Sequence, residues 1–439
     1  MIRNLLKILE SWKIKVSRRP LLLRGARQVG KTWIVREHGK SYDTFVELNL
    51  EERPEYAKPF KELYGQPGLL IQSIENITGQ QVNPGATLLF IDEIQDCPEA
   101  LLSLRYFKEK MPELHVIAAG SLLEFSLKEH SFPVGRIEFA FLFPLSFEEF
   151  LQAQGRGDLI SRISEMSHRH PADAATHDLL IDLYSIYSVL GGLPEVIQTY
   201  IDGGSFQECQ DIQQLIVGTY REDFHKYASK ANVGHLRKLF ERAPALLGQA
   251  FKYSHVDRET KSRELSKALD LLEEAGLVYR VTHSSANGSP LLAQEKQRKF
   301  KLHFVDIGLC QRLLGVEIGS LITPSSRVNH VLKGALTEQF VAQELISLTP
   351  SNEKPRLHYW CREAKSSKAE VDFLWEYNRE IFPIEVKSGT GGSMKSLHIF
   401  MKEKKQHLSH GFKASQGNWS LHDGIESIPF YGLANRLGR

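Results

Sequence analysis

The sequence predicts an α/β protein of several domains. Its 439 residues exceed what one ordinary hydrophobic core organises, so about two to four domains are expected. Short apolar runs at 20–24, 87–91 and 115–119 read as buried strands within a largely helical context. Two further strand patterns, 369–375 and 381–387, lie near the C-terminus. The first group indicates an open α/β sheet and the second a separate, smaller α/β domain.

The composition is that of a soluble globular protein, with 42% hydrophobic and 25% charged residues and no long Pro, Gly or Ser tract. A formal net charge of +2 gives no electrostatic signature of a nucleic-acid coat protein, although charge can still gather on one face. The four cysteines lack CxxC spacing, which argues against a zinc ribbon or a disulfide framework. They are Cys97, Cys209, Cys310 and Cys361.

The first twenty residues alternate apolar with basic side chains at helical spacing and contain no signal-peptide core followed by a small-residue cleavage site. They predict an amphipathic helix. No window approaches the ~18 consecutive apolar residues that a transmembrane helix needs. We therefore expect a protein that does not span a membrane, and the cysteine pattern given above predicts a cytoplasmic one.

The apolar run 20–24 leads directly into GARQVGKT at 25–32, which is GxxxxGK(S/T) in the strand-loop-helix context that this motif requires. Gly25 and Gly30 let backbone N–H groups turn around phosphate oxygens, and the Lys31 ammonium reaches the β- and γ-phosphates. Thr32 supplies a hydroxyl to Mg²⁺. The predicted ATP-binding residues are Gly25, Ala26, Arg27, Gln28, Val29, Gly30, Lys31 and Thr32.

The strand 87–91 ends in Asp92 and Glu93, at the sheet edge where nucleotide sites lie in open α/β folds. We expect Asp92 to hold Mg²⁺ through water and Glu93 to polarise the attacking water. A switch that only binds ATP needs Asp92 alone. The strand 115–119 leads to Ser121, which is a candidate γ-phosphate sensor; the alternative is that it caps a helix.

Further segments are shared with one family. They are GARQVGKT at 25–32, LLFIDEIQ at 88–95, Leu104-Arg105-Tyr106, AAGSLLEF at 118–125, Gly135-Arg136 and FPLSF at 143–147. On these segments the chain resembles, over nearly its whole length, the AAA-type ATPases of a widespread prokaryotic family whose second half carries a domain with a nuclease-like fold. The resemblance implies that Arg136 approaches the γ-phosphate, in cis or from a neighbouring copy in a homo-oligomer. A surface salt bridge is the alternative duty for Arg136.

The order of patterns predicts four domains. The ATPase domain covers 1–155, and a helical lid or linker covers 156–235. Residues 236–325 read as helices followed by a strand pair, which suggests a winged helix. Three basic residues near the start of its second helix can contact DNA phosphates, although such modules also serve only for packing. They are Lys261, Arg263 and Lys267.

The last predicted domain, 326–439, carries carboxylates and a lysine in strand patterns. Side chains alternate along a strand, so if the two strands are neighbours, Asp372, Glu385 and Lys387 converge, with Glu338 reaching in from a helix. Such carboxylates can hold Mg²⁺ or Mn²⁺, and Lys387 can orient the attacking water. The pattern is similar to the PD-(D/E)xK nuclease fold, except that Val371 stands before Asp372. The alternative is a cross-strand salt bridge.

Together these features predict an ATPase that couples its nucleotide state to DNA engagement or to metal-dependent cleavage of DNA. The rival prediction is an ATP-dependent switch or scaffold whose C-terminal domain binds nucleic acid or protein without cutting it.

Overall fold

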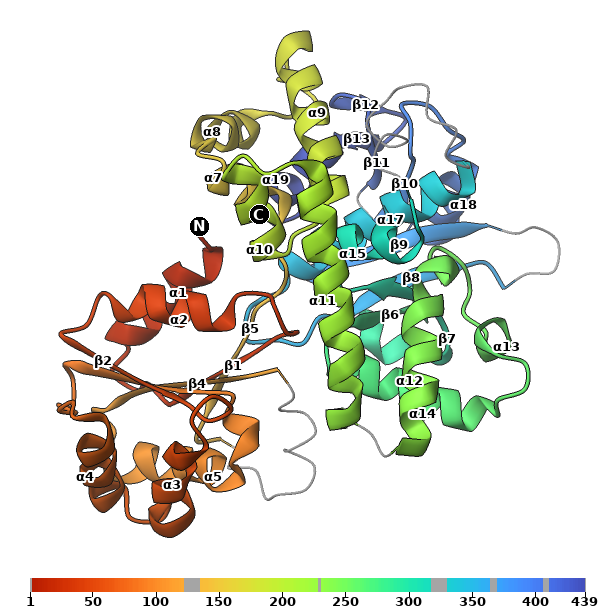
Figure 1. Cartoon of the computed structure of the whole chain (residues 1–439). Helices are drawn as coiled ribbons and strands as arrows, with labels where there is room; N and C mark the ends of the chain where they lie inside the picture. Colours follow the sequence, from red (N-terminus) through yellow and green to blue (C-terminus); the bar gives the residue numbers. More distant parts are fainter. Residues whose placement is uncertain are drawn as a thin grey trace. The chain divides into compact units, whose positions relative to one another are not determined.

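The computed structural model describes residues 2–121, 135–227, 230–316, 330–363, 369–405 and 410–438. The chain forms two compact units, of which the first comprises residues 1–143 with 350–354 and the second comprises 144–349 with 355–439. Figure 1 shows the helices and strands of both. Within the described ranges, no helix is both long and apolar enough to cross a membrane. Cys97, Cys209 and Cys310 are buried free thiols, and Cys361 is a partly exposed one.

The first unit is built on a five-stranded parallel sheet in the order β2-β3-β4-β1-β5. Its strands are β1 (Leu21–Arg24), β2 (Thr44–Asn49), β3 (Thr87–Asp92), β4 (His115–Gly120) and β5 (Glu138–Phe141). The three predicted strands are therefore confirmed. Because every pair is parallel, the carboxyl ends of all five strands lie along one edge.

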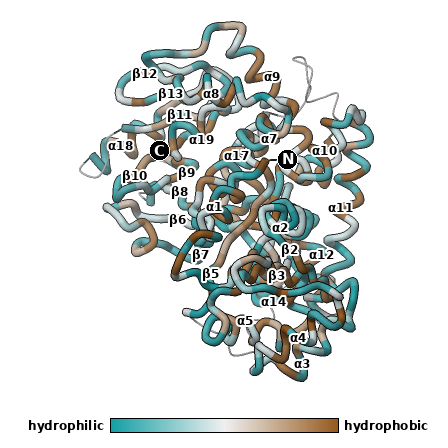
Figure 2. Tube along the Cα trace, turned by 90° about the vertical axis from the view of Figure 1, so that its left-hand side faces the viewer, coloured by the Kyte–Doolittle hydropathy of each residue, from teal (hydrophilic) through white to brown (hydrophobic). Residues whose placement is uncertain are grey.

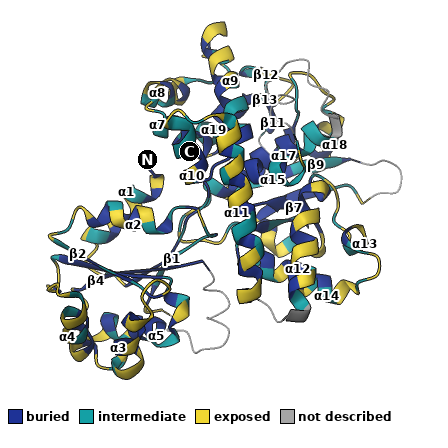
Figure 3. Cartoon of the chain, viewed as in Figure 1, coloured by how far each residue is buried: buried dark blue, intermediate teal, exposed yellow. Residues whose placement is uncertain are grey.

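Helices cover both faces of this sheet. Figure 1 shows α1 (Asn4–Ile14) and α2 (Lys31–Gly39) on one face, and α3 (Ala57–Leu63), α4 (Pro67–Thr78) and α5 (Pro98–Lys110) on the other. Leu5, Leu9 and Trp12 of α1 are buried at helical spacing, which confirms the predicted amphipathic helix. All six residues of β3 and of β4 are buried, as strands covered on both faces must be (Figure 3).

The second unit is mainly helical around a mixed sheet. Its helices are α7 (Phe147–Ala153), α8 (Gly157–Glu165), α9 (Ala174–Leu190), α10 (Pro194–Ile201), α11 (Phe206–Tyr227), α12 (Lys230–Arg242), α13 (Tyr253–Val256), α14 (Ser262–Glu274), α15 (Ile307–Leu313), α17 (His330–Ser347), α18 (Lys395–Glu403) and α19 (Leu433–Leu437). Figure 2 shows hydrophilic and hydrophobic residues interspersed along the chain. In α14 the predicted apolar stripe of Leu265, Leu269 and Leu272 is fully buried.

The sheet of the second unit has eight strands in the order β12-β13-β11-β10-β9-β8-β6-β7. They are β6 (Val278–Ser284), β7 (Glu295–Phe304), β8 (Leu357–Cys361), β9 (Glu370–Tyr377), β10 (Glu380–Val386), β11 (Gly411–Ser415), β12 (Ser420–His422) and β13 (Ile425–Pro429). Along the chain, helix α17 is followed by three antiparallel strands, helix α18 and a strand, β11, that runs parallel to β10. The two strands predicted near the C-terminus, β9 and β10, are neighbours.

The β6–β7 hairpin was expected to belong to a separate winged-helix domain over 236–325. It instead extends the C-terminal sheet, because β6 pairs in parallel with β8. Both long edges of β6 are thus occupied, by β7 on one side and β8 on the other. The hairpin and the C-terminal strands consequently share one core.

Buried polar contacts also join segments that the sequence analysis had divided. The Asp306 carboxylate accepts a hydrogen bond from the backbone N–H of Gly192 (2.6 Å) and one from the Gln343 amide (3.3 Å). Glu344 of α17 accepts from the backbone N–H of Phe147 at the start of α7 (2.9 Å). Helix α7, placed in the ATPase domain by the sequence analysis, therefore packs in the second unit.

Candidate functional site

The loop between β1 and α2 has the backbone of a phosphate-binding cradle. Gly25, Gln28 and Gly30 have positive φ angles of 153°, 66° and 94°. A Cβ atom added to Gly25 would lie 2.2 Å from the carbonyl oxygen of Leu142, so only glycine fits there. The motif therefore uses its first glycine for a close backbone approach and its second to begin α2.

Lys31, the first residue of α2, points into this loop. Its ammonium donates to the carbonyl oxygens of Gly25 (3.0 Å) and Ala26 (2.9 Å). Burial lowers the pKa of Lys31 to about 8, and the charges of Glu93 and Asp92 oppose that shift. A cation held this close to the loop can reach phosphate oxygens placed in the cradle.

Thr32 and Asp92 connect the loop to the neighbouring acidic strand end. The Thr32 hydroxyl donates to an Asp92 carboxylate oxygen at 2.7 Å, and the other oxygen accepts from the backbone N–H of Glu93 at 3.1 Å. Burial raises the pKa of Asp92 to about 6, and the hydrogen bond from Thr32 acts against this rise. A hydroxyl and a carboxylate side by side form the oxygen set that Mg²⁺ prefers, so these two residues fit the ion that accompanies ATP.

Glu93 and Ser121 lie at the same sheet edge. Glu93 has a left-handed backbone (φ 48°), and its carboxylate accepts a hydrogen bond from the Gln95 amide at 2.7 Å. Ser121 is buried directly after β4, the strand between β3 and β1. Glu93 follows β3 and Ser121 follows β4, and β4 is the neighbour of the strand that leads into the phosphate loop. Residues 122–125 of the shared AAGSLLEF segment lie outside the described residues.

Arg3, which the sequence analysis did not single out, holds the phosphate loop from outside. The Arg3 guanidinium donates to the carbonyl oxygens of Val29 (3.0 Å) and Phe143 (2.6 Å), and the residue is 4% exposed. In a planar trans peptide the C=O and N–H groups point in opposite directions. Because the Val29 carbonyl faces Arg3, the N–H of Gly30 in the same peptide plane points away from Arg3, as a phosphate donor must.

The two other arginines predicted for this site are in ion pairs. Arg27 pairs with Glu51 at 3.1 Å. Arg136 pairs with Glu109 of α5 at 3.3 Å, and its side chain is 48% exposed. This pair is the surface contact that the sequence analysis weighed against the finger role of Arg136.

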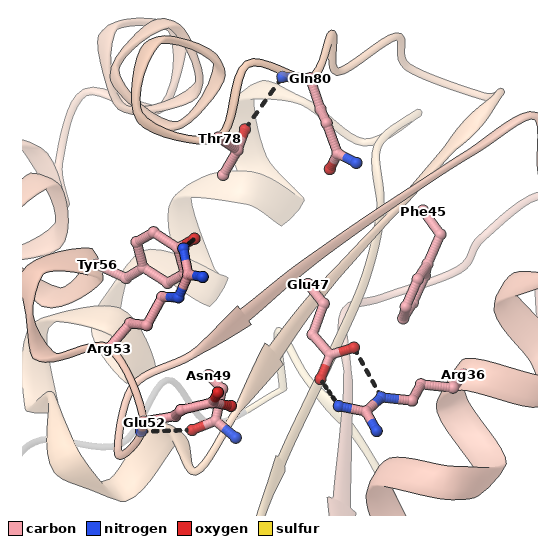
Figure 4. Close-up of a pocket in the computed structure, with 9 residues that line it drawn as sticks. All are labelled: Arg36, Phe45, Glu47, Asn49, Glu52, Arg53, Tyr56, Thr78 and Gln80. Atoms are coloured by element: carbon pink, nitrogen blue, oxygen red, sulfur yellow. Dashed lines mark hydrogen bonds and ion pairs between the residues drawn. The ribbon is translucent and has the colours of Figure 1, made fainter.

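A hollow of about 330 Å³ lies along β2, the edge strand of the same sheet (Figure 4). It is lined by Arg36, Phe45, Glu47, Asn49, Glu52, Arg53, Tyr56, Thr78 and Gln80. The guanidinium of Arg36 donates to both carboxylate oxygens of Glu47 (2.9 and 2.7 Å), and Arg53 donates to the Tyr56 hydroxyl. Two arginines and two glutamates give this hollow no excess charge for a phosphate, and it shares no residue with the phosphate loop.

The C-terminal carboxylates do converge, but around a lysine from β7. The ammonium of Lys301 lies 2.5 Å from Glu370, 3.4 Å from Glu338 and 3.6 Å from Asp372. Asp372 also accepts a hydrogen bond from the backbone N–H of Val386 (2.8 Å). Glu338 and Asp372 thus both lie near one cation, Lys301, which the sequence analysis did not single out.

The remaining two residues of the predicted set form their own pair. Lys387 donates to one carboxylate oxygen of Glu385 at 2.7 Å, and the other oxygen is buried without a hydrogen-bond partner. Burial raises the pKa of Glu385 to about 7, and that of Glu338 to about 8. Burial alone would lower the pKa of Lys301. The negative charges of Glu338, Asp372 and Glu370 outweigh burial, so the pKa of Lys301 is raised.

A divalent ion does not fit this C-terminal set as it stands, because a buried ammonium already contacts the same oxygens. In the described ranges of the chain, no group of three or more His, Cys, Asp or Glu residues is arranged to hold a metal ion. The basic residues that were predicted to contact DNA phosphates, Lys261, Arg263 and Lys267, lie exposed at the start of α14.

Known protein families match three segments of the chain. Residues 17–151 match the model described as AAA domain, 181–318 match Domain of unknown function (DUF8612), and 333–432 match Domain of unknown function (DUF4143). Uncharacterized proteins Rv2008c of Mycobacterium tuberculosis and Mb2031c of Mycobacterium bovis are each 24% identical over 374 residues. The match covers 84% of this chain and 70% of each relative.

Among solved structures, the Walker-type ATPase PABY2304 of Pyrococcus abyssi is 17% identical with a TM-score of 0.44, over 71% of this chain and 95% of that one. The STAND protein PH0952 of Pyrococcus horikoshii, which has a tetratricopeptide repeat sensor, is 13% identical with a TM-score of 0.29, over 80% of this chain and 46% of that one. The family model and the geometry of the phosphate loop agree that residues 17–151 carry an AAA-type, ATP-binding domain.

Proposed function

We propose that this protein hydrolyses ATP in its first unit and uses the nucleotide state to control its C-terminal segment. That segment binds nucleic acid or protein and does not cleave it. The observation that carries the ATPase proposal is the 2.7 Å hydrogen bond between Thr32 and Asp92, since it brings the end of the phosphate loop to the acidic end of β3. A bound Mg²⁺ would be held by these two residues and would neutralise charge on the β- and γ-phosphates.

The residues of this chain have distinct duties in the proposed reaction. The loop N–H groups and Lys31 bind the phosphates, and Glu93 at the end of β3 orients the attacking water and takes up its proton. Ser121 would contact the γ-phosphate from the adjacent strand end. Arg136 would have to leave Glu109 to stabilise the transferred phosphoryl group, in cis or in a neighbouring copy.

The link to the second unit is supported by the position of the loop. Gly25 approaches Leu142, and Arg3 bonds both Val29 of the loop and Phe143. Phe143 is the residue at which the chain leaves the first unit. A change in the loop on nucleotide binding therefore acts directly on the segment that continues into the second unit.

A second candidate function is metal-dependent cleavage of DNA. It is favoured by the helix, three antiparallel strands, helix and parallel strand of α17 to β11, which support the resemblance to PD-(D/E)xK nucleases. Glu338, Asp372 and the Glu385–Lys387 pair are all present. The Lys301 ammonium between the carboxylates favours binding of nucleic acid or protein without cleavage instead.

Phosphate release from ATP tests the proposed activity. We expect turnover by the wild type and its loss in Lys31→Ala and Glu93→Gln, whereas the exposed-residue controls Lys61→Ala and Glu62→Gln should behave as wild type. Equal turnover in Glu93→Gln would refute the role of Glu93.

Coupling and cleavage need a second assay. Labelled DNA is incubated with the protein in ATP, in ADP and without nucleotide, with Mg²⁺ or Mn²⁺ present. Binding that depends on the nucleotide, with the DNA left intact, supports the first function. Cutting that disappears in Asp372→Ala supports the second.

A further inference from the structure

We propose that the Lys301 ammonium takes the cation position of the C-terminal carboxylate set, so that this set needs no divalent metal ion. The proposal deepens the non-cutting role given above to the C-terminal segment, and it concerns residues remote in sequence from the phosphate loop. Glu338, Glu370 and Asp372 all lie within ion-pair distance of this one group. A metal centre built from the same residues would place its ion among the same oxygens.

The burial of Lys301 shows that its position is fixed. Its side chain is 1% exposed, and lysines are almost never buried so completely unless they are paired. The ring of Tyr359 lies against the ammonium, 5.4 Å from its centroid. Three carboxylates and an aromatic face thus replace the water that a lysine loses on burial.

The same contacts exclude a second cation. Mg²⁺ and Mn²⁺ require direct oxygen ligands at ~2.0–2.2 Å, and they are bound through carboxylates such as those around Lys301. An ion at that point would lie beside the ammonium and compete for the same oxygens. The lysine cannot swing into solvent without leaving its buried place on β7, at the edge of the sheet.

The cation and the carboxylates come from different parts of the chain. Lys301 belongs to the segment that matches one domain model, 181–318, whereas Glu338 and Asp372 belong to the segment that matches another, 333–432. Strand β7 enters this arrangement through the β6–β8 pairing. The middle segment therefore supplies a positive charge to the C-terminal carboxylates.

Without the lysine, these carboxylates would have no counter-ion, and their side chains would have to move together to hold a metal ion. Glu385 has one buried carboxylate oxygen with no hydrogen-bond partner, and Asp372 is near enough to raise its pKa. Glu338 reaches the same place from α17. Replacing Lys301 with methionine, which has a similar length and no charge, leaves at least three carboxylates for a hard divalent ion.

Binding of Mn²⁺ to the full chain, followed by electron paramagnetic resonance without nucleotide, tests this inference. We expect wild type to bind no more Mn²⁺ than Asp372→Asn. Lys301→Met should gain a bound Mn²⁺ that is lost again in Lys301→Met/Asp372→Asn. Lys301→Arg, which keeps the positive charge, should gain none.

Two results would overturn the proposal. One is Mn²⁺ binding by wild type that Asp372→Asn abolishes; the other is a folded Lys301→Met variant that binds no Mn²⁺. If circular dichroism shows that Lys301→Met does not fold, the comparison of wild type with Asp372→Asn decides alone. Phosphate release from ATP is measured on the same wild-type sample, so a failure of the ATPase proposal is seen separately.

Discussion

Replacing Arg3 with alanine tests how the phosphate loop keeps its shape. Arg3 makes two hydrogen bonds from a charged donor, one to the carbonyl oxygen of Val29, which is buried, and one to that of Phe143, which is partly buried. Each such bond contributes about 1.5–3 kcal/mol, so we expect Arg3→Ala to lower the free energy of unfolding of the first unit by about 3 kcal/mol. The loss includes the cost of leaving both carbonyls without a partner.

The effect on ATP is separate from the effect on stability. Without Arg3 the Val29–Gly30 peptide is free to rotate, and the Gly30 N–H no longer points constantly at the phosphates. If this costs about 1.4 kcal/mol of ATP-binding free energy, the Kd for ATP rises about tenfold. The Kd of Arg3→Lys for ATP should lie between those of wild type and Arg3→Ala, because an ammonium cannot bind both carbonyls as a planar guanidinium does.

Urea unfolding gives the stability change, and calorimetric titration with ATP and Mg²⁺ gives the Kd. The titration is done where circular dichroism shows each variant to be folded. Lys7→Ala, an exposed change on α1, the helix that Arg3 precedes, is the matched control. An Arg3→Ala variant that loses stability but binds ATP as wild type would refute the role of Arg3 in shaping the loop.

Three further changes have expected outcomes. Gly25→Ala places a Cβ atom 2.2 Å from the carbonyl oxygen of Leu142. It should lower the free energy of unfolding in urea by about 1–3 kcal/mol and abolish ATP binding in the calorimetric titration. Normal ATP binding would contradict the close packing at Gly25. Burial raises the pKa of Glu344 to about 8, so the folded state keeps a proton that the unfolded state loses above about pH 4.5, and stability should fall between those pH values. In Glu344→Gln, the decrease in the free energy of unfolding between pH 5 and pH 8 should be smaller than in wild type by roughly 2–4 kcal/mol, as measured by urea unfolding. The same pH dependence in wild type and variant would contradict the role of Glu344. Arg136→Ala breaks only a partly exposed pair with Glu109, so stability should change by less than about 1 kcal/mol while ATP turnover falls about tenfold or more; full turnover would remove the finger role.

Much of the nucleotide site was predictable because its signals are local. The strand, loop and helix around Gly25 to Thr32 follow one another directly, and Asp92 ends an apolar strand. Parallel strands then bring their ends to one edge without further information. Arg3 was not predictable in this way, since its partners are 26 and 140 residues away and a lone arginine before a helix has no pattern.

In the C-terminal carboxylate set, too, the contact that comes from a distant part of the chain was not predicted. Alternation along β9 and β10 placed Asp372 and Glu385 on the correct side of neighbouring strands. Lys301 lies 37 residues before Glu338, in a basic run that was assigned to a separate hairpin. Only the parallel pairing of β6 with β8 brings that hairpin into the sheet, and no local pattern encodes such a pairing.

The domain boundaries were the least predictable feature. Composition gave no reason to separate α7 from the first unit. In the structure α7 belongs to the second unit, where the backbone N–H of Phe147 donates to Glu344, 197 residues away. Contacts between residues so far apart leave no periodic signal in the sequence.

The most direct test of the ATPase proposal is a single-turnover experiment on wild type and Glu93→Gln with γ-labelled ATP and Mg²⁺, in which bound ATP and released phosphate are measured in the same sample. We predict that both proteins bind ATP and that only wild type converts it to ADP and phosphate. Conversion at the same rate by Glu93→Gln, or bound ATP that wild type leaves uncleaved, would contradict the proposal.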